Sequence, residues 1–154
     1  MKQESLRPRV LEYLHAHHVM TLATQGDAGP WAAAVFYASD GFTLYWLSAP
    51  SSRHSLNLAR NPRVAAAVQE DYADWPQIKG VQLEGAAAEI GGDEERHART
   101  LYGGKYPVVG NLAKAPASIV AAMAKVRWYR LAPERLYLID NSIAFGHREE
   151  LTLR

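Results

Sequence analysis

The residues best suited to chemistry lie between positions 45 and 68, where small and basic side chains follow a predicted strand. The segment reads YWLSAPSSRHSLNLARNPRVAAAV, so a strand ends at Ser48 and a short helix opens near Arg53 and His54. A helix N-terminus offers free backbone N–H groups and a partial positive charge, to which arginine, hydroxyl groups and a protonated histidine would add. The segment therefore predicts a phosphate-binding site. In the alternative interpretation, Ser52 caps the helix and Arg53 is a solvated charge.

Two other motifs do not complete a site. Of the histidines at 15, 17 and 18, only His15 and His18 share a helix face, and no carboxylate is spaced to complete a metal site. Gly103-Gly104-Lys105 lacks the first glycine and the terminal Ser or Thr of a phosphate-binding P-loop. We therefore predict no metal site and no P-loop.

The composition limits the function classes. A chain of 154 residues predicts one domain, spanning residues 1–154. Seventeen Lys and Arg against sixteen Asp and Glu give no reason to expect a nucleic-acid partner. The absence of cysteine excludes disulfides and thiolate chemistry, and the chain has no apolar run of membrane-spanning length. We expect a cytoplasmic protein with no membrane partner.

The elements that must position these residues are mostly strands. Apolar residues at helical spacing predict a helix over 6–17, and later capping signals predict a short helix after Ser51 or Ser52 and helices over 93–102 and 117–125. Alternating and β-branched segments predict the strands 19–24, 32–38, 42–48, 64–68 and 79–90, with strand character again over 126–146. Turns are expected at Asp40-Gly41, Pro133 and Asp140-Asn141, and Gly85 is expected at a bend or bulge.

Short antiparallel strands with helices at the edges predict a mainly β fold, a β-barrel with peripheral helices. Most connections between strands are too short for the crossover helices of a parallel sheet, so a Rossmann site is not expected.

The sequence resembles the pyridoxamine 5'-phosphate oxidase-like FMN-binding split barrels over essentially the whole chain. The hallmark is a strand, a Ser or Thr, a serine-containing turn with basic residues, a short helix and Asn-Pro-Arg-Val. The matching residues are Ser48, Ser52, Arg53, His54, Leu58 and Asn61-Pro62-Arg63-Val64. The segments RHSLNLARNPRVAAAV, KGVQLEGAAAEI and LYLIDNSIAFGHREEL are most similar to the small bacterial YhbP-like branch. The resemblance implies a split barrel of about six to seven antiparallel strands.

The resemblance also implies a site for FMN. Arg53 and His54 would meet the phosphate, beside Ser48, Ser52 and the backbone of Leu47. The strand from Trp31 to Phe36, including Ala33 and Val35, would lie along the isoalloxazine ring. In the same family the flavin sits between two subunits, so a homodimer is implied, with Asn141, Phe145 and His147 approaching from the partner.

Three residues of this predicted site carry specific expectations. His54 stands where a Lys is common in the family, and a neutral imidazole donates only one hydrogen bond, so phosphate affinity should fall above the His pKa, normally near 6.5. Trp31 stands where many members place an Arg on the phosphate. Gln82 supplies a donor and an acceptor for a flavin's pyrimidine edge, but strand alternation also allows it to face solvent.

The first functional hypothesis is an FMN-dependent oxidoreductase with a small-molecule substrate or electron donor such as NADH or NADPH, because the flavin itself carries out the redox chemistry. Pyridoxamine phosphate is not the expected substrate, since GHREELTLR does not match the basic C-terminal motif of the true oxidases. Other hypotheses are a non-catalytic flavin carrier or sensor, a barrel binding a deazaflavin or haem, with His54 or His147 as axial ligand, and a structural dimer without cofactor.

Overall fold

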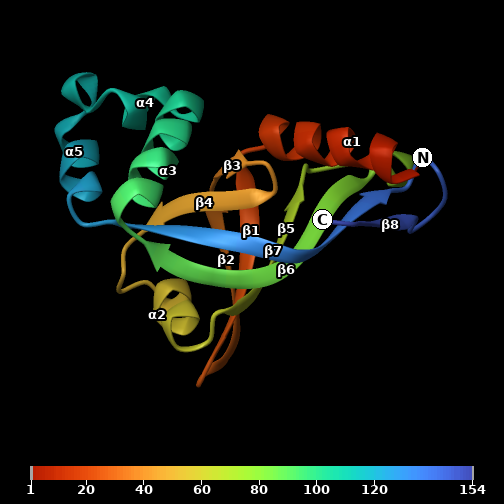
Figure 1. Cartoon of the computed structure of the whole chain (residues 1–154), viewed down its shortest axis with the longest axis horizontal. Coiled ribbons are helices and arrows are strands. Elements are labelled where there is room, and N and C mark those ends of the chain that lie inside the picture. The colour runs from red at the N-terminus through yellow and green to blue at the C-terminus, as the bar shows by residue number, and fades with distance from the viewer. Residues whose placement is uncertain (1, 154) are drawn as a thin grey trace.

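The protein is described by a computed structural model covering residues 2–153, in which a curled antiparallel sheet carries helices along its edges (Figure 1). The predicted mainly β fold is confirmed. The sheet has eight strands, and two short ones, β3 and β8, were not predicted. The strands are β1 (Val19–Gly26), β2 (Gly29–Phe36), β3 (Ala38–Asp40), β4 (Thr43–Ser48), β5 (Arg63–Gln69), β6 (Lys79–Ile90), β7 (Arg127–Asp140) and β8 (Arg148–Leu151).

The helices flank this sheet and agree with the predicted ones in position. The predicted helix over 6–17 begins earlier, and the connection after Lys105, to which the sequence assigned no element, contains short helical turns. The helical elements are α1 (Lys2–Ala16), α2 (Arg53–Arg60), η1 (Trp75–Gln77), α3 (Gly92–Lys105), α4 (Pro107–Gly110), η2 (Leu112–Lys114) and α5 (Ala117–Met123). No helix within residues 2–153 is long and apolar enough to span a membrane.

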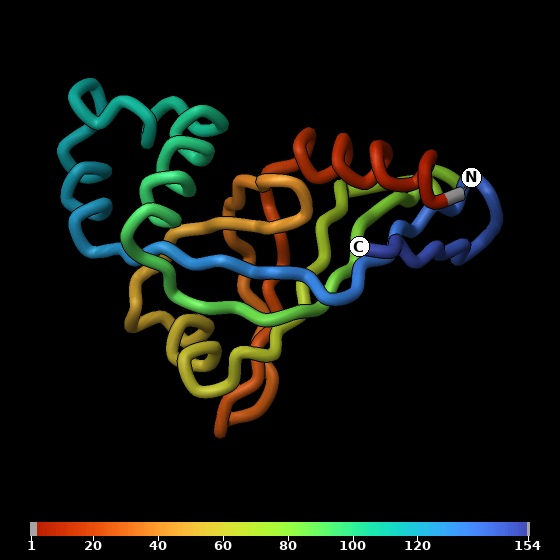
Figure 2. Tube along the Cα trace, viewed as in Figure 1, coloured from red at the N-terminus to blue at the C-terminus, as the bar shows by residue number. Residues whose placement is uncertain are grey.

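The sheet runs in the order β2-β1-β5-β6-β7-β4-β3, and β8 pairs with β7. β7 pairs with β6 along its length, with β4 through its first residues and with β8 through its last. The trace in Figure 2 shows the sheet curling, with β1 and β2 running across the direction of β6 and β7. β2 also approaches β4, although the two strands are not paired. The curl gives the sheet an inner and an outer face.

The main core fills the inner face. Strand alternation buries Met20 and Leu22 of β1 together with Trp46 of β4, while α1 covers them with Leu6 and Leu14. At roughly 25 cal/mol per Å² of apolar surface, each such side chain contributes about 1.5–3 kcal/mol. This core fixes which face of each strand remains available for a ligand.

A bulge in β6 lies where the register shifts between Glu84 and Gly85. A side chain at Gly85 would come within 2.1 Å of the carbonyl oxygen of Ala132, so only glycine allows this close approach. The predicted bend is therefore confirmed. The predicted turn at Pro133 is wrong: β7 continues through Pro133, whose missing N–H is tolerated because it stands opposite the bulge.

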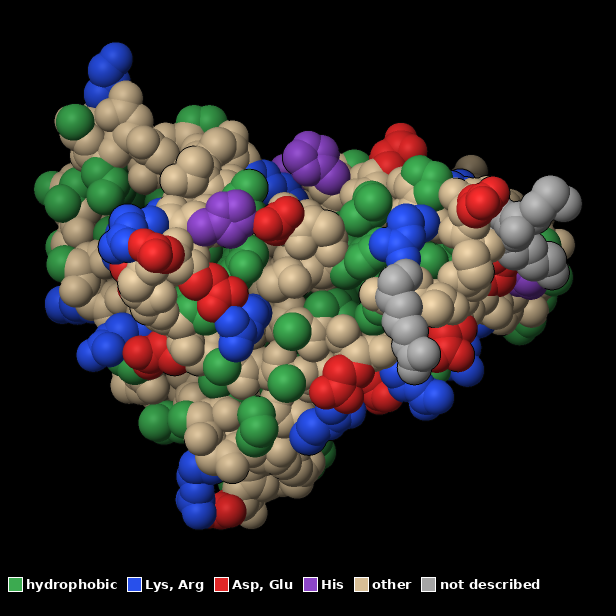
Figure 3. All heavy atoms as spheres, in the orientation of Figure 1, with side chains coloured by type: hydrophobic (Ala, Val, Ile, Leu, Met, Phe, Trp, Pro, Cys, Tyr) green, Lys and Arg blue, Asp and Glu red, His purple; other side chains and the backbone are tan. Residues whose placement is uncertain are grey.

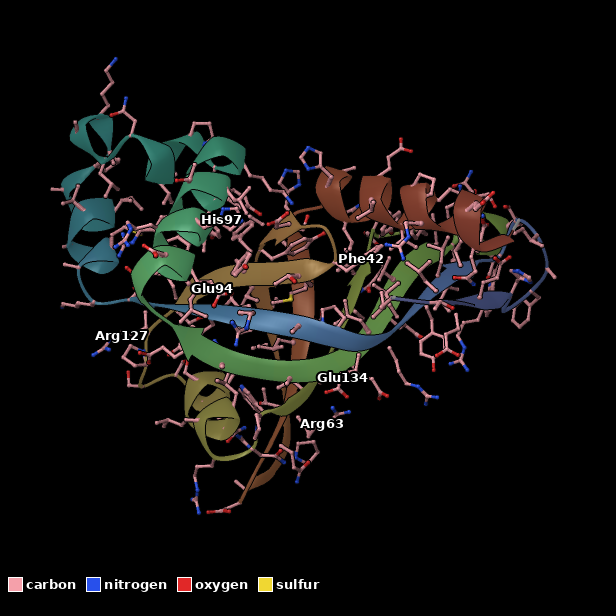
Figure 4. All side chains as sticks on the ribbon, viewed as in Figure 1. Phe42, Arg63, Glu94, His97, Arg127 and Glu134 are labelled. Carbon is pink, nitrogen blue, oxygen red and sulfur yellow. The ribbon has the colours of Figure 1, made fainter. Side chains whose placement is uncertain are left out.

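An ion pair spans the bulge from β5 to β7. Arg63 at the start of β5 pairs with Glu134 just after Pro133, and Figure 4 shows the two side chains pointing toward one another beneath the sheet. Both are about half exposed, so the pair contributes little to stability. The pair links β5 to β7 across the bulged strand β6.

Helix α3 packs against β3 and β4, whereas the helical segment that follows it, through α5, extends beyond the sheet (Figure 1). Residues 107–126 have no buried side chain. Two hydrogen bonds hold the start of this helical segment. Lys105 donates to the carbonyl of His17, and the Tyr106 hydroxyl lies 2.6 Å from the carbonyl oxygen of Tyr37. In Figure 1 the segment lies on the side of β4 away from α2, so it does not cover the start of α2.

Candidate functional site

The junction between β4 and α2 begins with a hydroxyl cap. Ser52 has extended backbone angles, and its Oγ accepts the backbone N–H of Ser55 at 3.3 Å. The same Oγ donates to the Ser55 hydroxyl at 2.7 Å. This cap leaves other N–H groups of the first turn free, as at any helix N-terminus. The capping role considered as an alternative is therefore confirmed, and it leaves room for an anion at the helix start.

His54 lies between the two predicted hydroxyl groups. Its Nε2 is 2.8 Å from Ser48 Oγ and 3.3 Å from Ser52 Oγ. Burial lowers the pKa of His54 below its usual value, because the charged imidazolium is poorly solvated there. The ring is therefore neutral near pH 7 and adds a hydrogen bond, not a cation, to the junction.

Arg53 supplies the positive charge. Its guanidinium carbon lies 4.2 Å from the centre of the Trp31 ring, a stacked cation–π contact. Its only hydrogen bond within residues 2–153 is a long one of 3.5 Å to the carbonyl oxygen of Ala28. By contrast, Arg60 at the other end of α2 pairs with Asp27 at 2.6 Å. Arg53 is thus held in place by an aromatic ring while most of its donors stay available.

A hollow of about 670 Å³ lies beside Arg53, between the β1–β2 turn and α2. It is lined by Gln25, Ala28, Ser51, Arg53, Asn57 and Arg60, among others. The hollow gives an anion a path to the start of the helix.

The residues of β2 divide between the two faces of the sheet. Trp31, Ala33 and Val35 stand opposite Thr24, Leu22 and Met20, so they belong to the inner face. Phe36 belongs to the outer face and is 56% exposed. Within residues 2–153, β2 pairs only with β1, so its free edge offers backbone donors and acceptors. These are the backbone groups that the resemblance places along a flavin ring.

Leu47 takes part through its backbone alone. It stands opposite Trp128 of β7, and its side chain packs against the smaller core cluster under α3. The expectation that the Leu47 backbone, and not its side chain, lies beside the phosphate agrees with this packing.

Gln82 does not join the α2 junction. It is exposed on the outer face, opposite Ala67 of β5 and Tyr137 of β7. Within one chain, Gln82 and the inner-face residues Trp31 and Ala33 therefore lie on opposite sides of the sheet.

Asn141, Phe145 and His147 also lie away from the junction, in the loop between β7 and β8, at the far end of the molecule from α2 (Figure 1). Asn141 Oδ1 accepts the N–H of Gly146 at 3.1 Å, and His147 Nε2 is 2.7 Å from Glu149. Phe145 is 78% exposed and stacks on Trp75 at 5.1 Å. Only a second copy of the chain could bring these residues to the α2 junction.

The sequence interpretation missed a second hollow, of about 480 Å³, on the outer face. Strand register aligns small residues of β1 and β5 beside polar residues of β6 and β7. The aligned rows are Thr21, Ala67, Gln82, Tyr137 and Ala23, Ala65, Glu84, Arg135. The alternation VQLEG indicated the orientation of Gln82, but only the register between distant strands reveals the hollow.

The face of the molecule shown in Figure 3 carries charges of both signs. Figure 3 shows acidic and basic side chains interspersed over the face it presents, without one continuous basic area. Within residues 2–153 no group of three or more His, Asp or Glu residues is arranged to hold a metal ion. Among the hollows of the described residues, the one beside Arg53 and the one on the outer face contain residues that the sequence singled out.

Comparison with known proteins places this chain in a family. A family profile described as pyridoxamine 5'-phosphate oxidase matches residues 6–140. The chain belongs to the pyridoxamine 5'-phosphate oxidase family. A UPF0306 protein from Yersinia pestis is 32% identical over 138 residues, which cover 88% of this chain and 86% of that protein. These relatives confirm the resemblance to the small bacterial branch.

Solved structures support the fold. A haem-binding protein from Mycobacterium smegmatis superposes with a TM-score of 0.71 at 24% identity, covering 91% of this chain and 55% of that one. A putative pyridoxamine 5'-phosphate oxidase from Listeria innocua gives 0.67 at 18% identity, covering 86% and 97%. This fold therefore occurs both in a protein named for binding haem and in one named as a putative pyridoxamine 5'-phosphate oxidase.

Proposed function

We propose that the protein is an FMN-binding flavoprotein that acts as an oxidoreductase and binds the FMN phosphate at the N-terminus of α2. The observation that supports this most is the gathering of Ser48, Ser52, Arg53 and His54 where the helix begins. Free N–H groups, hydroxyl groups and one accessible guanidinium are the donors that a phosphate prefers.

The groups at this junction would offer a phosphate one cation and several neutral hydrogen-bond donors. Arg53 is the cation, while the neutral His54 and Ser48 hydrogen-bond to each other and reorient only at the loss of that bond. Trp31 brings no charge but holds Arg53 in place. We therefore expect weaker phosphate binding than two cations would give, and little change in FMN affinity with pH above about 7, because His54 is already neutral there.

The proposal includes a homodimer in which each subunit completes the other's site. Gln82 lies on the outer face of the sheet and cannot serve the cofactor of its own chain. A carboxamide from the partner would satisfy the donor and acceptor of a flavin's pyrimidine edge. Bound flavin would supply the electron-transfer chemistry, and the chain's residues would orient it.

The test is a visible absorption spectrum of the purified protein, before and after FMN is added and excess is removed by desalting. Flavin bands that stay with the wild type, and are lost with Arg53→Ala but not with Arg96→Ala, support the proposal. Arg96 is the matched control because it is an exposed arginine on another helix, α3, and is already paired with Asp93. A colourless wild type rejects FMN binding.

Catalysis is tested separately from binding. Bleaching of the bound flavin by NADH or NADPH, followed by reoxidation in air, supports an oxidoreductase. A bound flavin that neither donor reduces favours the carrier or sensor.

Haem is the second candidate, because a structural neighbour is named for binding it. In this chain the ring nitrogen Nε2 of His147 is 2.7 Å from Glu149, and that of His54 is 2.8 Å from Ser48. Either histidine must break this contact to ligate iron through Nε2. A Soret band that appears on adding haemin and disappears with His54→Ala or His147→Ala would favour this candidate over FMN.

A further inference from the structure

A third hollow, of about 300 Å³, lies between α2 and the paired ends of β6 and β7, and the proposed function does not use it. Its bottom is formed by buried residues and its mouth by exposed apolar ones. The buried residues are Ser55, Leu58, Ala87 and Tyr129, and those at the mouth include Pro50, Leu56, Ala59 and Pro62. The hollow is therefore a mainly apolar recess under α2 with two hydroxyl groups at its bottom.

The hydroxyl of Tyr129 has no partner in the fold. Tyr129 is 2% exposed, yet its hydroxyl makes no hydrogen bond within residues 2–153. The fully enclosed side-chain atoms without a partner in that range are the indole nitrogens of Trp46 and Trp128, so the Tyr129 hydroxyl still touches open space. The open space that Tyr129 lines is this hollow. A ligand atom that accepts its proton would satisfy a group that is costly to bury alone.

Ser55 brings a second hydroxyl to the bottom of the hollow. Ser55 is 2% exposed, and its Oγ accepts from Ser52 Oγ at 2.7 Å, which leaves its own proton without an acceptor among the described residues. Both hydroxyls can therefore donate into the hollow. A carbonyl oxygen is the matching group, because it accepts through two lone pairs and brings no proton that would need an acceptor in return.

The walls favour a neutral ligand. Of the described residues that line the hollow, Glu89 alone is charged, and its carboxylate lies 3.3 Å from the guanidinium of Arg127. At the mouth, Leu56 is 56% exposed. An apolar ligand would remove part of this side chain from water, which is favourable by about 25 cal/mol per Å². The hollow thus offers an ion no free partner and offers an apolar body a surface to cover.

We propose that the hollow under α2 binds a small neutral molecule with a compact apolar body and one carbonyl group, whose oxygen accepts the proton of the Tyr129 hydroxyl. A recess that is mainly apolar and contains a few placed polar groups is typical of small-molecule sites. The proposal does not rest on FMN binding, because Arg53 and His54 are not among the residues that line this hollow.

The test titrates 4-fluoroacetophenone and its hydrocarbon analogue 1-ethyl-4-fluorobenzene into the full-length protein without FMN, followed by fluorine NMR of the probes. One added hydrogen bond should make the wild type bind the ketone about three- to tenfold more tightly than the hydrocarbon. Tyr129→Phe should abolish this preference and retain the affinity for the hydrocarbon. Tyr137→Phe, the same change at another position of β7, should leave the preference intact.

A second variant tests the shape of the hollow. Ala59→Leu, at the exposed mouth, should fill the hollow and weaken the binding of both probes, and a thermal melt of each variant identifies any loss of fold. Equal ketone affinity of the wild type and Tyr129→Phe overturns the proposal. The absence of binding by the wild type does so too, since water alone then occupies the hollow.

Arg53→Ala separates this proposal from the proposed function. Arg53 does not line the hollow, so the variant should lose FMN and keep its preference for the ketone. Ketone binding by a wild type that does not bind FMN would reject the proposed function and leave this site standing. FMN binding without ketone binding would do the reverse.

Discussion

Two of the arginines that rest on aromatic rings in this protein have different surroundings. Arg53 on Trp31 stands at a helix N-terminus among hydroxyl groups and a neutral histidine. Arg148 on Tyr137 stands at the edge of a flat floor of small side chains. The first arginine therefore lies among hydrogen-bond donors that suit a compact anion, whereas the second borders a surface of small apolar side chains.

Both regions depend on β6, on opposite sides of its bulge. Gln82 and Glu84 lie before the bulge and line the outer hollow. Ala87 lies after the bulge, and its N–H donates to the carbonyl of Pro62 at 2.8 Å, which holds the segment that follows α2. A change at Gly85 should therefore disturb the two regions together.

The largest effect is expected from Gly85→Val. The new Cβ would meet the carbonyl oxygen of Ala132, a backbone atom that cannot move aside, so the cost should be about 3 kcal/mol or more. A thermal melt should fall by roughly 10 °C. Gly104→Ala, where nothing lies within 4 Å, serves as control. If Gly85→Val melts with the wild type, the bulge does not hold the two regions together.

Arg53→Ala should have the next largest effect. Losing one charge-assisted contact to phosphate should weaken FMN binding by roughly 10- to 100-fold, measured by quenching of flavin fluorescence. Arg148→Ala should change FMN affinity less than about twofold, since it does not lie at the helix start. Equal losses from both variants would mean that the two regions bind one ligand jointly.

The sequence predicted the first region because its parts are local. Ser48, Ser52, Arg53 and His54 fall within seven consecutive positions, and a strand followed by a capped helix brings them together without help from the rest of the chain. The mainly β fold followed from alternation and turn signals in the same way. What local signals missed were β3 and β8, which are too short to show a pattern.

The second region could not be predicted, because it depends on long-range register. Ala67, Gln82 and Tyr137 become neighbours only through the pairing of β5, β6 and β7. The stacking of Trp31 on Arg53 is of the same kind, since the two residues belong to different elements. The prediction of a turn at Pro133 was wrong for the same reason. Pro133 fits within β7 because it stands opposite Gly85 at the bulge, and Gly85 is remote in the sequence.

The pH dependence of stability should distinguish the two regions. Burial lowers the pKa of His54 in the folded state, so the unfolded chain binds the proton more readily. Stability should therefore fall as the pH drops through about 6.5, the unfolded value, and level off below the folded pKa. Thermal melts from about pH 7.5 to about pH 5 should show a smaller decrease for His54→Gln than for the wild type. Arg148→Gln should follow the wild type, and identical curves for all three would place His54 outside the effect.

The smallest effect is expected from removing the ring on which Arg53 rests while keeping the arginine. A cation–π contact at an exposed site is worth about 0.5–1 kcal/mol, so Trp31→Ala should weaken FMN binding by about two- to fivefold.

An aromatic replacement completes this test. Trp31→Phe keeps a ring and should retain most of the affinity. If Trp31→Ala instead strengthens FMN binding, the indole competes with the phosphate for Arg53 and does not position it. The departure from the family's arginine at position 31 would then be a barrier to FMN.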